Sequence, residues 1–248
     1  MIFSTTDILL LSNKVLSSLS SLDNEIKVGA SSEQLVFPIK NQKKGTVIRK
    51  SEQELRLLFL EALRDDYTSI SYSIETPTTK KYKFGESHAE IVANANIQTT
   101  DGQSALIDLC IHEITDTNKY DRTVNIEFKH KNCGLPKISK DILKLMKEPI
   151  NGAFIHLLDN TDSGTLVNNG LRQGVLDKLR VSFESLSEQW CNTDKSILII
   201  ILSLEDGNPV QMVSREMVKK DLLKLDKIFF KGTMKLKIQD IPNKNGWN

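Results

Sequence analysis

The sequence lacks an excess of charge of one sign. It has 33 Lys and Arg residues against 32 Asp and Glu residues, a net charge of +1 over 248 residues. A protein that coats nucleic acid through a broad basic surface carries a large positive excess, so contact with DNA or RNA must come from a local patch. Only three cysteines occur, with no CxxC pair. Their scarcity argues against a disulfide framework or a zinc site and favours the cytoplasm.

Long apolar runs are also missing. The longest, 197–202, is far shorter than the roughly 20 residues that cross a bilayer, and it is typical of a buried strand. The first residues show no basic stretch with an apolar segment long enough for a secretion signal. A glycine-rich phosphate loop, GxSxG and HExxH are absent too. We therefore expect a cytoplasmic protein with no membrane partner.

The most informative stretch is 104–132, where a polar connector joins two short apolar segments. Each segment alternates with period two, which is typical of a strand with two unlike faces. Asp108 falls opposite the apolar face of the first segment, and Glu127 and Lys129 fall opposite that of the second. If the segments pair as a hairpin, two carboxylates and an ammonium gather on one surface. Such a group suits a hard divalent cation and a phosphate.

This arrangement resembles the PD-(D/E)XK, or restriction-endonuclease-like, nuclease superfamily. The motif is Ile107-Asp108 followed by Glu127-Phe128-Lys129, with Ile107 in place of the family's proline. The resemblance implies a nuclease that depends on Mg²⁺ or Mn²⁺. Asp108, Glu127 and the backbone carbonyl of Phe128 would hold the metal. Lys129 would orient or deprotonate the attacking water and stabilise developing charge.

The surrounding elements follow the order of the family's core, α-β-β-β-α-β. The sequence predicts a helix opening at Ser51, strands at 70–76 and 82–84, the two segments above, a helix at 139–147 and a strand at 153–159. The resemblance thus implies an α/β fold with a restriction-endonuclease-like core, in which helices flank a mixed sheet. An N-terminal helix and a C-terminal α/β extension complete it.

We expect three regions along the chain. They are an N-terminal helix and irregular arm at 1–50, the nuclease-like core at 51–160, and a C-terminal extension of the same domain at 161–248. In the arm, apolar residues at helical spacing predict a helix at 5–22, followed by a short strand at 35–39. The segment 85–103 is polar and predicts only a loop or a short helix. The extension predicts a helix at 170–189 and a buried strand at 196–204, then short segments at 212–218 and 235–241 with a helix between them.

Three further acids are candidates for the site. In the resembled family the first helix often supplies another carboxylate, and Glu54 is our choice, with Glu61 in reserve two turns on. The alternative is that Glu54 only caps the helix that Ser51 opens. Glu75 could face the same site as Asp108, or it could be a solvated glutamate on an edge strand.

Lysines near the motif are candidates for binding a nucleic-acid backbone. Lys131 follows the second strand, and Lys140 and Lys144 lie one turn apart on the next helix. The alternative for the two helical lysines is a solvated face. His156, inside an apolar strand, is expected to be a core histidine.

The functional hypothesis is therefore metal-dependent hydrolysis of phosphodiester bonds in nucleic acid, by a DNA endonuclease in the first instance. RNA, and a homodimer that cuts both strands, stay open. One alternative is a catalytically degenerate nuclease-fold module that binds nucleic acid or a protein partner. Another is an ordinary α/β protein in which Glu127 and Lys129 form a surface ion pair worth little.

Overall fold

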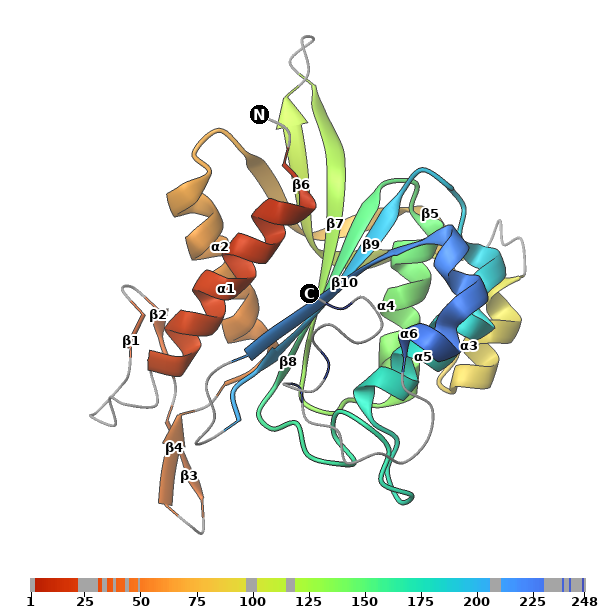
Figure 1. Ribbon diagram of the computed structural model, residues 1–248. Helices are drawn as coiled ribbons and strands as arrows, with labels where there is room; N and C mark the ends of the chain where they lie inside the picture. The colour runs from red at the N-terminus through yellow and green to blue at the C-terminus, as the bar shows by residue number, and fades with distance from the viewer. Residues whose placement is uncertain are drawn as a thin grey trace.

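The structure is a computed structural model, and it describes residues 3–21, 31–32, 35–37, 39–42, 45–48, 50–96, 102–114, 119–205, 211–229, 238, 241 and 247. Its centre is a six-stranded mixed sheet in the order β10-β9-β8-β7-β6-β5 (Figure 1). The strands are β5 (Ser71–Tyr82), β6 (Gln103–Ile114), β7 (Tyr120–His130), β8 (Asn151–Leu158), β9 (Ser196–Ser203) and β10 (Gln211–Val218). The pairs β7–β8 and β8–β9 are parallel, and the other pairs are antiparallel.

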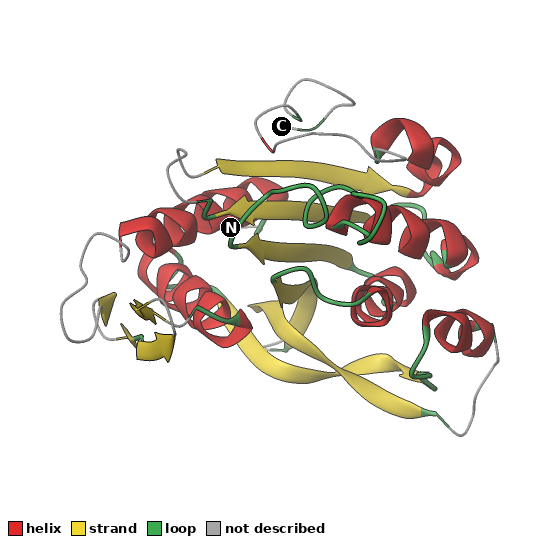
Figure 2. Cartoon of the chain, turned by 90° about the horizontal axis from the view of Figure 1, so that it is seen from below, coloured by secondary structure: helices red, strands yellow, loops and turns green. Residues whose placement is uncertain are grey.

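Helices cover both faces of the sheet (Figure 2). One face packs against α1 (Thr5–Ser21) and α2 (Glu52–Asp66). The other packs against α3 (His88–Ala95), α4 (Leu135–Lys147), α5 (Val175–Ser185) and α6 (Leu225–Ile228). Two small antiparallel sheets pair β1 (Ser31–Ser32) with β2 (Leu35–Val36) and β3 (Ile39–Gln42) with β4 (Gly45–Ile48), and 3₁₀ turns η2 (Ser187–Gln189) and η3 (Lys219–Lys224) follow α5 and β10. No helix in these described ranges is long and apolar enough to cross a membrane.

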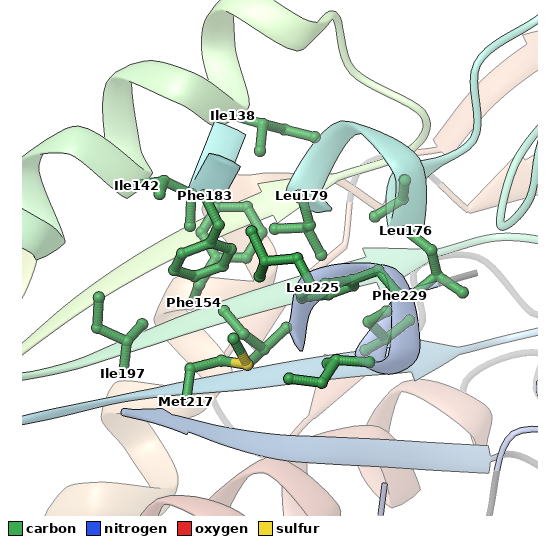
Figure 3. Packing of buried hydrophobic residues seen from close by; sticks show 14 of the residues in the cluster. Ile138, Ile142, Phe154, Leu176, Leu179, Phe183, Ile197, Met217, Leu225 and Phe229 are labelled. Carbon is green, nitrogen blue, oxygen red and sulfur yellow. The ribbon is translucent and has the colours of Figure 1, made fainter. Parts of the chain in front are cut away.

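The central strands are apolar on both faces because helices bury them on both sides, as is usual for parallel strands. In β8, Ile155 belongs to the core under α1 and α2, whereas its neighbour Phe154 belongs to the core under α4 and α5. Figure 3 shows this second core, where Phe154 and Ile197 from the sheet lie beneath Phe183 of α5. Truncating a fully buried aromatic such as Phe183 typically costs about 3–5 kcal/mol, so this packing holds α5 on the sheet.

The strands β6 and β7 separate part-way along their length. Their pairing runs from Ile114 opposite Tyr120 to Leu109 opposite Ile126 and stops there. Beyond that point β6 stays beside β5, and β7 continues in parallel with β8. We call this point the β6–β7 fork. Backbone groups at the fork need partners other than the neighbouring strand, since an unpaired buried amide or carbonyl is costly.

The edge strand β5 differs from the sequence prediction. The two segments expected at 70–76 and 82–84 form one strand, β5, with a register shift between Pro77 and Lys81. The buried carboxylate of Glu148, just after α4, accepts hydrogen bonds from the backbone N–H groups of Thr79 and Lys80, both at 3.1 Å. This long-range contact satisfies the bulged backbone, so the chain need not leave the sheet at Pro77.

Most other predicted elements are confirmed, with shifted ends. The helices at the N-terminus and after Ser51, and the strands β8, β9 and β10, lie where the sequence predicts them. The helix α4 begins earlier, at Leu135, because Pro136 is favourable in a first helical turn. The helix α5 begins later, at Val175, because the preceding Gly174 is pressed against the backbone of a loop. The polar segment 85–103 does contain a short helix, α3. The segment predicted at 235–241 lies mostly outside the described residues.

The core histidine predicts a pH dependence of stability. His156 is fully buried, its Nε2 donates to the Lys131 carbonyl at 2.5 Å, and burial lowers its pKa from 6.5 to about 4. Between these values the unfolded chain binds a proton that the folded chain does not. The free energy of unfolding should therefore fall as pH drops from 6.5 to 4, by up to about 1.4 kcal/mol per pH unit from this residue.

Chemical denaturation across that pH range measures the effect. The substitution His156→Gln keeps a hydrogen-bond donor but cannot titrate. Between pH 6.5 and 4, the unfolding free energy of the variant should therefore fall less steeply than that of wild type, by the contribution of up to one bound proton. An identical slope in both proteins would show that His156 is not the group responsible.

Candidate active site

The β6–β7 fork holds the first acid of the motif. Oδ2 of Asp108 accepts a hydrogen bond of 2.8 Å from the backbone N–H of Phe128. In an unbroken antiparallel pair that N–H would reach a backbone carbonyl, so the Asp108 carboxylate replaces one strand contact where the strands separate. The side chain keeps 21% of its surface exposed. An acid is therefore fixed at a sheet position that solvent and ligands can still reach.

The second acid, Glu127, is fully buried beside the fork. Its Oε1 lies 2.6 Å from Nζ of Lys144 on α4. Its Oε2 is buried and has no hydrogen-bond partner among the described residues. Burial raises the pKa of Glu127 well above its usual 4.5, the Asp141 and Asp108 charges raise it further, and Lys144 opposes them. A carboxylate oxygen buried without a partner is costly, and a bound cation or a water would remove that cost.

The lysine of the motif is held as a cation. Lys129 Nζ lies 2.8 Å from Oδ2 of Asp141 and donates to the Phe128 carbonyl at 2.8 Å. It also lies 3.4 Å from Oε1 of Glu52. Burial lowers the pKa of Lys129, but the charges of Asp141 and Glu52 outweigh burial and raise it above 10.5. Lys129 therefore keeps its proton at neutral pH.

Two residues of α4 complete the buried cluster. Asp141 and Lys144, three positions apart, form an ion pair of 2.9 Å. Lys144 Nζ also donates to the Leu106 carbonyl at 2.8 Å, a group that the fork leaves without a partner on β7. Burial raises the pKa of Asp141, but the two lysines outweigh burial and lower it below 3.8. The sequence offered Lys144 as a phosphate ligand or as part of a solvated face, whereas its side chain is 9% exposed and its ammonium contacts Glu127 and Asp141.

The acid of α2 that contacts the motif lysine is Glu52, which the sequence did not single out. Residues 52 and 56 share a helix face, while residue 54 lies about 200° away around the axis. Glu52 contacts Lys129. Glu54 is buried and accepts a hydrogen bond from the Ser51 hydroxyl, the capping arrangement that was the alternative for it. Ser51 Oγ also caps the helix by accepting from the backbone N–H of Gln53 at 3.2 Å.

Arg56 was not anticipated from the sequence. Its Nη1 lies 3.1 Å from Oε1 of Glu75 and 3.8 Å from Oδ1 of Asp108. Glu75 is therefore tied to the site through Arg56, with 53% of its side chain exposed and a positive φ of 48°. An arginine between two acids at the mouth of the site can also turn toward a phosphate, since its planar fork suits two oxygens.

The remaining sequence candidates lie around this cluster. Lys131 is 64% exposed and lies 3.4 Å from Asp159. Lys140 lies over the ring of Phe84, 5.6 Å from its centroid. Lys131 remains available to a ligand, and Lys140 is held by a cation–π contact. Glu61 lies on α2 and is part-buried, and its place in the site stays a prediction.

The charges of the cluster do not balance. Five acids face three bases when all are ionised: the acids are Glu52, Glu75, Asp108, Glu127 and Asp141, and the bases are Arg56, Lys129 and Lys144. No group of three or more His, Cys, Asp or Glu side chains in the described ranges is arranged as a metal site. Mg²⁺ needs fewer protein side chains than three, because it is commonly held by one or two carboxylates together with water and substrate oxygens. Asp108, Glu127 and the Phe128 carbonyl, which accepts from Lys129, supply oxygen donors of the type that Mg²⁺ prefers.

No protein-family model and no curated protein matches this chain. One solved structure is similar, SfsA of Pyrococcus furiosus in complex with Ca²⁺. The similarity covers 71% of this chain and 74% of that one, with 9% sequence identity and a TM-score of 0.33. At so low a score the functional argument rests on the residues of this chain.

Proposed function

We propose that this protein is a metal-dependent nuclease of the restriction-endonuclease-like type, acting on phosphodiester bonds of nucleic acid, with DNA as the first substrate to test. The observation that carries the proposal is the position of Asp108 in the β6–β7 fork. There its carboxylate accepts a hydrogen bond from the backbone N–H of Phe128, the residue between Glu127 and Lys129. The order α2-β5-β6-β7-α4-β8, with α3 inserted, supports the same core. The fork brings the motif's three side chains and the charges of two helices together.

The metal site would consist of Asp108, Glu127 and the carbonyl of Phe128. A bound Mg²⁺ or Mn²⁺ would neutralise charge on the scissile phosphate and lower the pKa of an attacking water. Glu127 supports this assignment because its Oε2 has no other described partner and its pKa is raised in the absence of a cation. Without a cation, Asp108 and Glu127 repel each other.

Lys129 would act as a fixed positive charge. Because Asp141 and Glu52 raise its pKa, it is a poor proton acceptor at neutral pH. Its ammonium can instead donate to the attacking water or to an oxygen of the phosphate, where negative charge grows during in-line attack. Asp141 holds that ammonium at 2.8 Å and is therefore a positioning residue.

A catalytically degenerate module is the second candidate, and one observation favours it. Lys144 already neutralises one oxygen of Glu127 at 2.6 Å, which lowers the affinity of the site for a metal. Such a module would bind nucleic acid without cutting it. Binding without metal-dependent cleavage would select this candidate.

The deciding experiment is a panel of labelled single- and double-stranded DNA and RNA, incubated with Mg²⁺, Mn²⁺ or EDTA. We expect cleavage of at least one substrate with Mg²⁺ or Mn²⁺ and none with EDTA. Cleavage that persists in EDTA, or purified protein that binds neither cation in calorimetry, would contradict the proposal. With duplex substrates the same panel tests for a homodimer. A dimer with two active sites should cut both strands at once, whereas a monomer should first give nicked duplex.

A further inference from the structure

A second cation position lies next to the proposed metal site, and the protein's own lysine occupies it. Lys144 Nζ is within 2.6 Å of Oε1 of Glu127 and 2.9 Å of Oδ1 of Asp141. It also donates to the Leu106 carbonyl at 2.8 Å. These three oxygens come from β7, α4 and β6 in turn. Two carboxylates and a backbone carbonyl from separate elements are a ligand set that hard divalent cations use.

We propose that Lys144 is a built-in substitute for a second metal ion, so that the site takes one divalent cation where it would otherwise take two. This proposal rests on the proposed function for the first cation, but the second position is defined by Lys144's own contacts. Glu127 is shared: one oxygen faces the lysine, and the other is buried without a hydrogen-bond partner among the described residues. A carboxylate that bridges two cation positions is the usual link in two-metal sites, which hold ions about 3.5–4 Å apart.

Burial explains why a lysine can hold this position. The side chain is 9% exposed, and its three N–H donors have three oxygen acceptors, so little is lost by taking the ammonium out of water. The ammonium lies within 2.9 Å of both carboxylates, and this close opposite charge favours its charged form. A divalent ion can be removed by a chelator, whereas this charge cannot.

Removing the lysine tests the proposal. The substitution Lys144→Met keeps the length of the side chain but leaves Glu127 and Asp141 facing each other without a cation. We expect the variant to melt at a lower temperature than wild type in EDTA, and to regain most of that loss in Mn²⁺. Calorimetry and electron paramagnetic resonance should count one Mn²⁺ in wild type and two in the variant.

Two further proteins serve as controls. Lys140→Met makes the same change one turn away on α4, where the lysine lies over Phe84, and should bind Mn²⁺ as wild type does. The double variant Lys144→Met with Asp141→Asn removes one acid together with the base. It should show no second ion.

The outcomes separate this inference from the proposed function. A Lys144→Met protein that binds no more Mn²⁺ than wild type, or that stays unfolded in Mn²⁺, overturns the inference even if wild type cleaves nucleic acid. If wild type neither binds a divalent cation nor cleaves, while the variant gains one bound ion, the inference stands. In that case it is the nuclease proposal that fails.

Discussion

Replacing Asp108 by Asn should reduce metal-dependent cleavage by at least about a hundredfold and leave the fold intact. Removal of one group that stabilises transition-state charge typically costs about 10²–10³ in rate. Here the loss should be at the upper end, because the amide also weakens the proposed metal site. The fold should survive since the Asn oxygen can still accept the hydrogen bond from the Phe128 N–H that Asp108 accepts at 2.8 Å.

The measurement is the single-turnover rate on the preferred substrate, with Mn²⁺ affinity from calorimetry and melting temperature beside it. A matched control is Asp121→Asn, an exposed aspartate on the same hairpin, which should change none of the three. An Asp108→Asn protein that cleaves at the wild-type rate would refute the assignment. A large loss of melting temperature would instead show that Asp108 mainly stabilises the fork.

The sequence predicted the motif residues because strand periodicity is local information. Alternation with period two is enough to put Asp108, Glu127 and Lys129 opposite the buried positions Leu109 and Phe128. The uninterrupted apolar run 197–202 also predicted a strand buried on both faces, and this strand is β9. What periodicity does not contain is the point where two strands separate.

The residues that contact the motif side chains were harder to predict. They depend on where β6 and β7 separate and on which face each helix turns toward the sheet. Glu54 was chosen because the resembled family's first helix often supplies an acid, and Glu52, which contacts Lys129, was not considered. Glu54 accepts from the Ser51 hydroxyl at the start of the helix, on a different face from Glu52. Asp141 and Lys144 have the spacing of an ordinary surface ion pair on an amphipathic helix. Only the packing of α4 over β7 turns them inward.

The continuity of β5 was missed for a similar reason. Pro77 followed by polar residues is a local signal for a turn. The groups that keep the strand in the sheet come from Glu148, about seventy positions later, whose carboxylate contacts Thr79 and Lys80. A signal of this kind becomes visible only when α4 is placed against the sheet.

The second large effect is expected at Glu127, where stability and activity should move in opposite directions. Burial raises the pKa of this carboxyl well above 4.5, so in the absence of metal the folded chain binds a proton that the unfolded chain has lost. The free energy of unfolding should therefore decrease as pH rises from 4.5 through the folded pKa. Glu127→Gln has no such proton, and its advantage over wild type should grow with pH, by up to about 1.4 kcal/mol per unit.

Divalent metal should reverse the order of stability. Mn²⁺ binds only the folded protein and should raise the melting temperature of wild type, whereas Glu127→Gln has lost the charge that holds the ion. Cleavage by the variant should fall by about a hundredfold or more. Glu184→Gln, a change at a carboxylate 60% exposed on α5, is the control and should respond to pH and Mn²⁺ as wild type does. If Glu127→Gln is less stable than wild type in EDTA at every pH, the Lys144 ion pair outweighs the burial of Glu127. The carboxylate would then be a structural group, and the metal site would lose its central ligand.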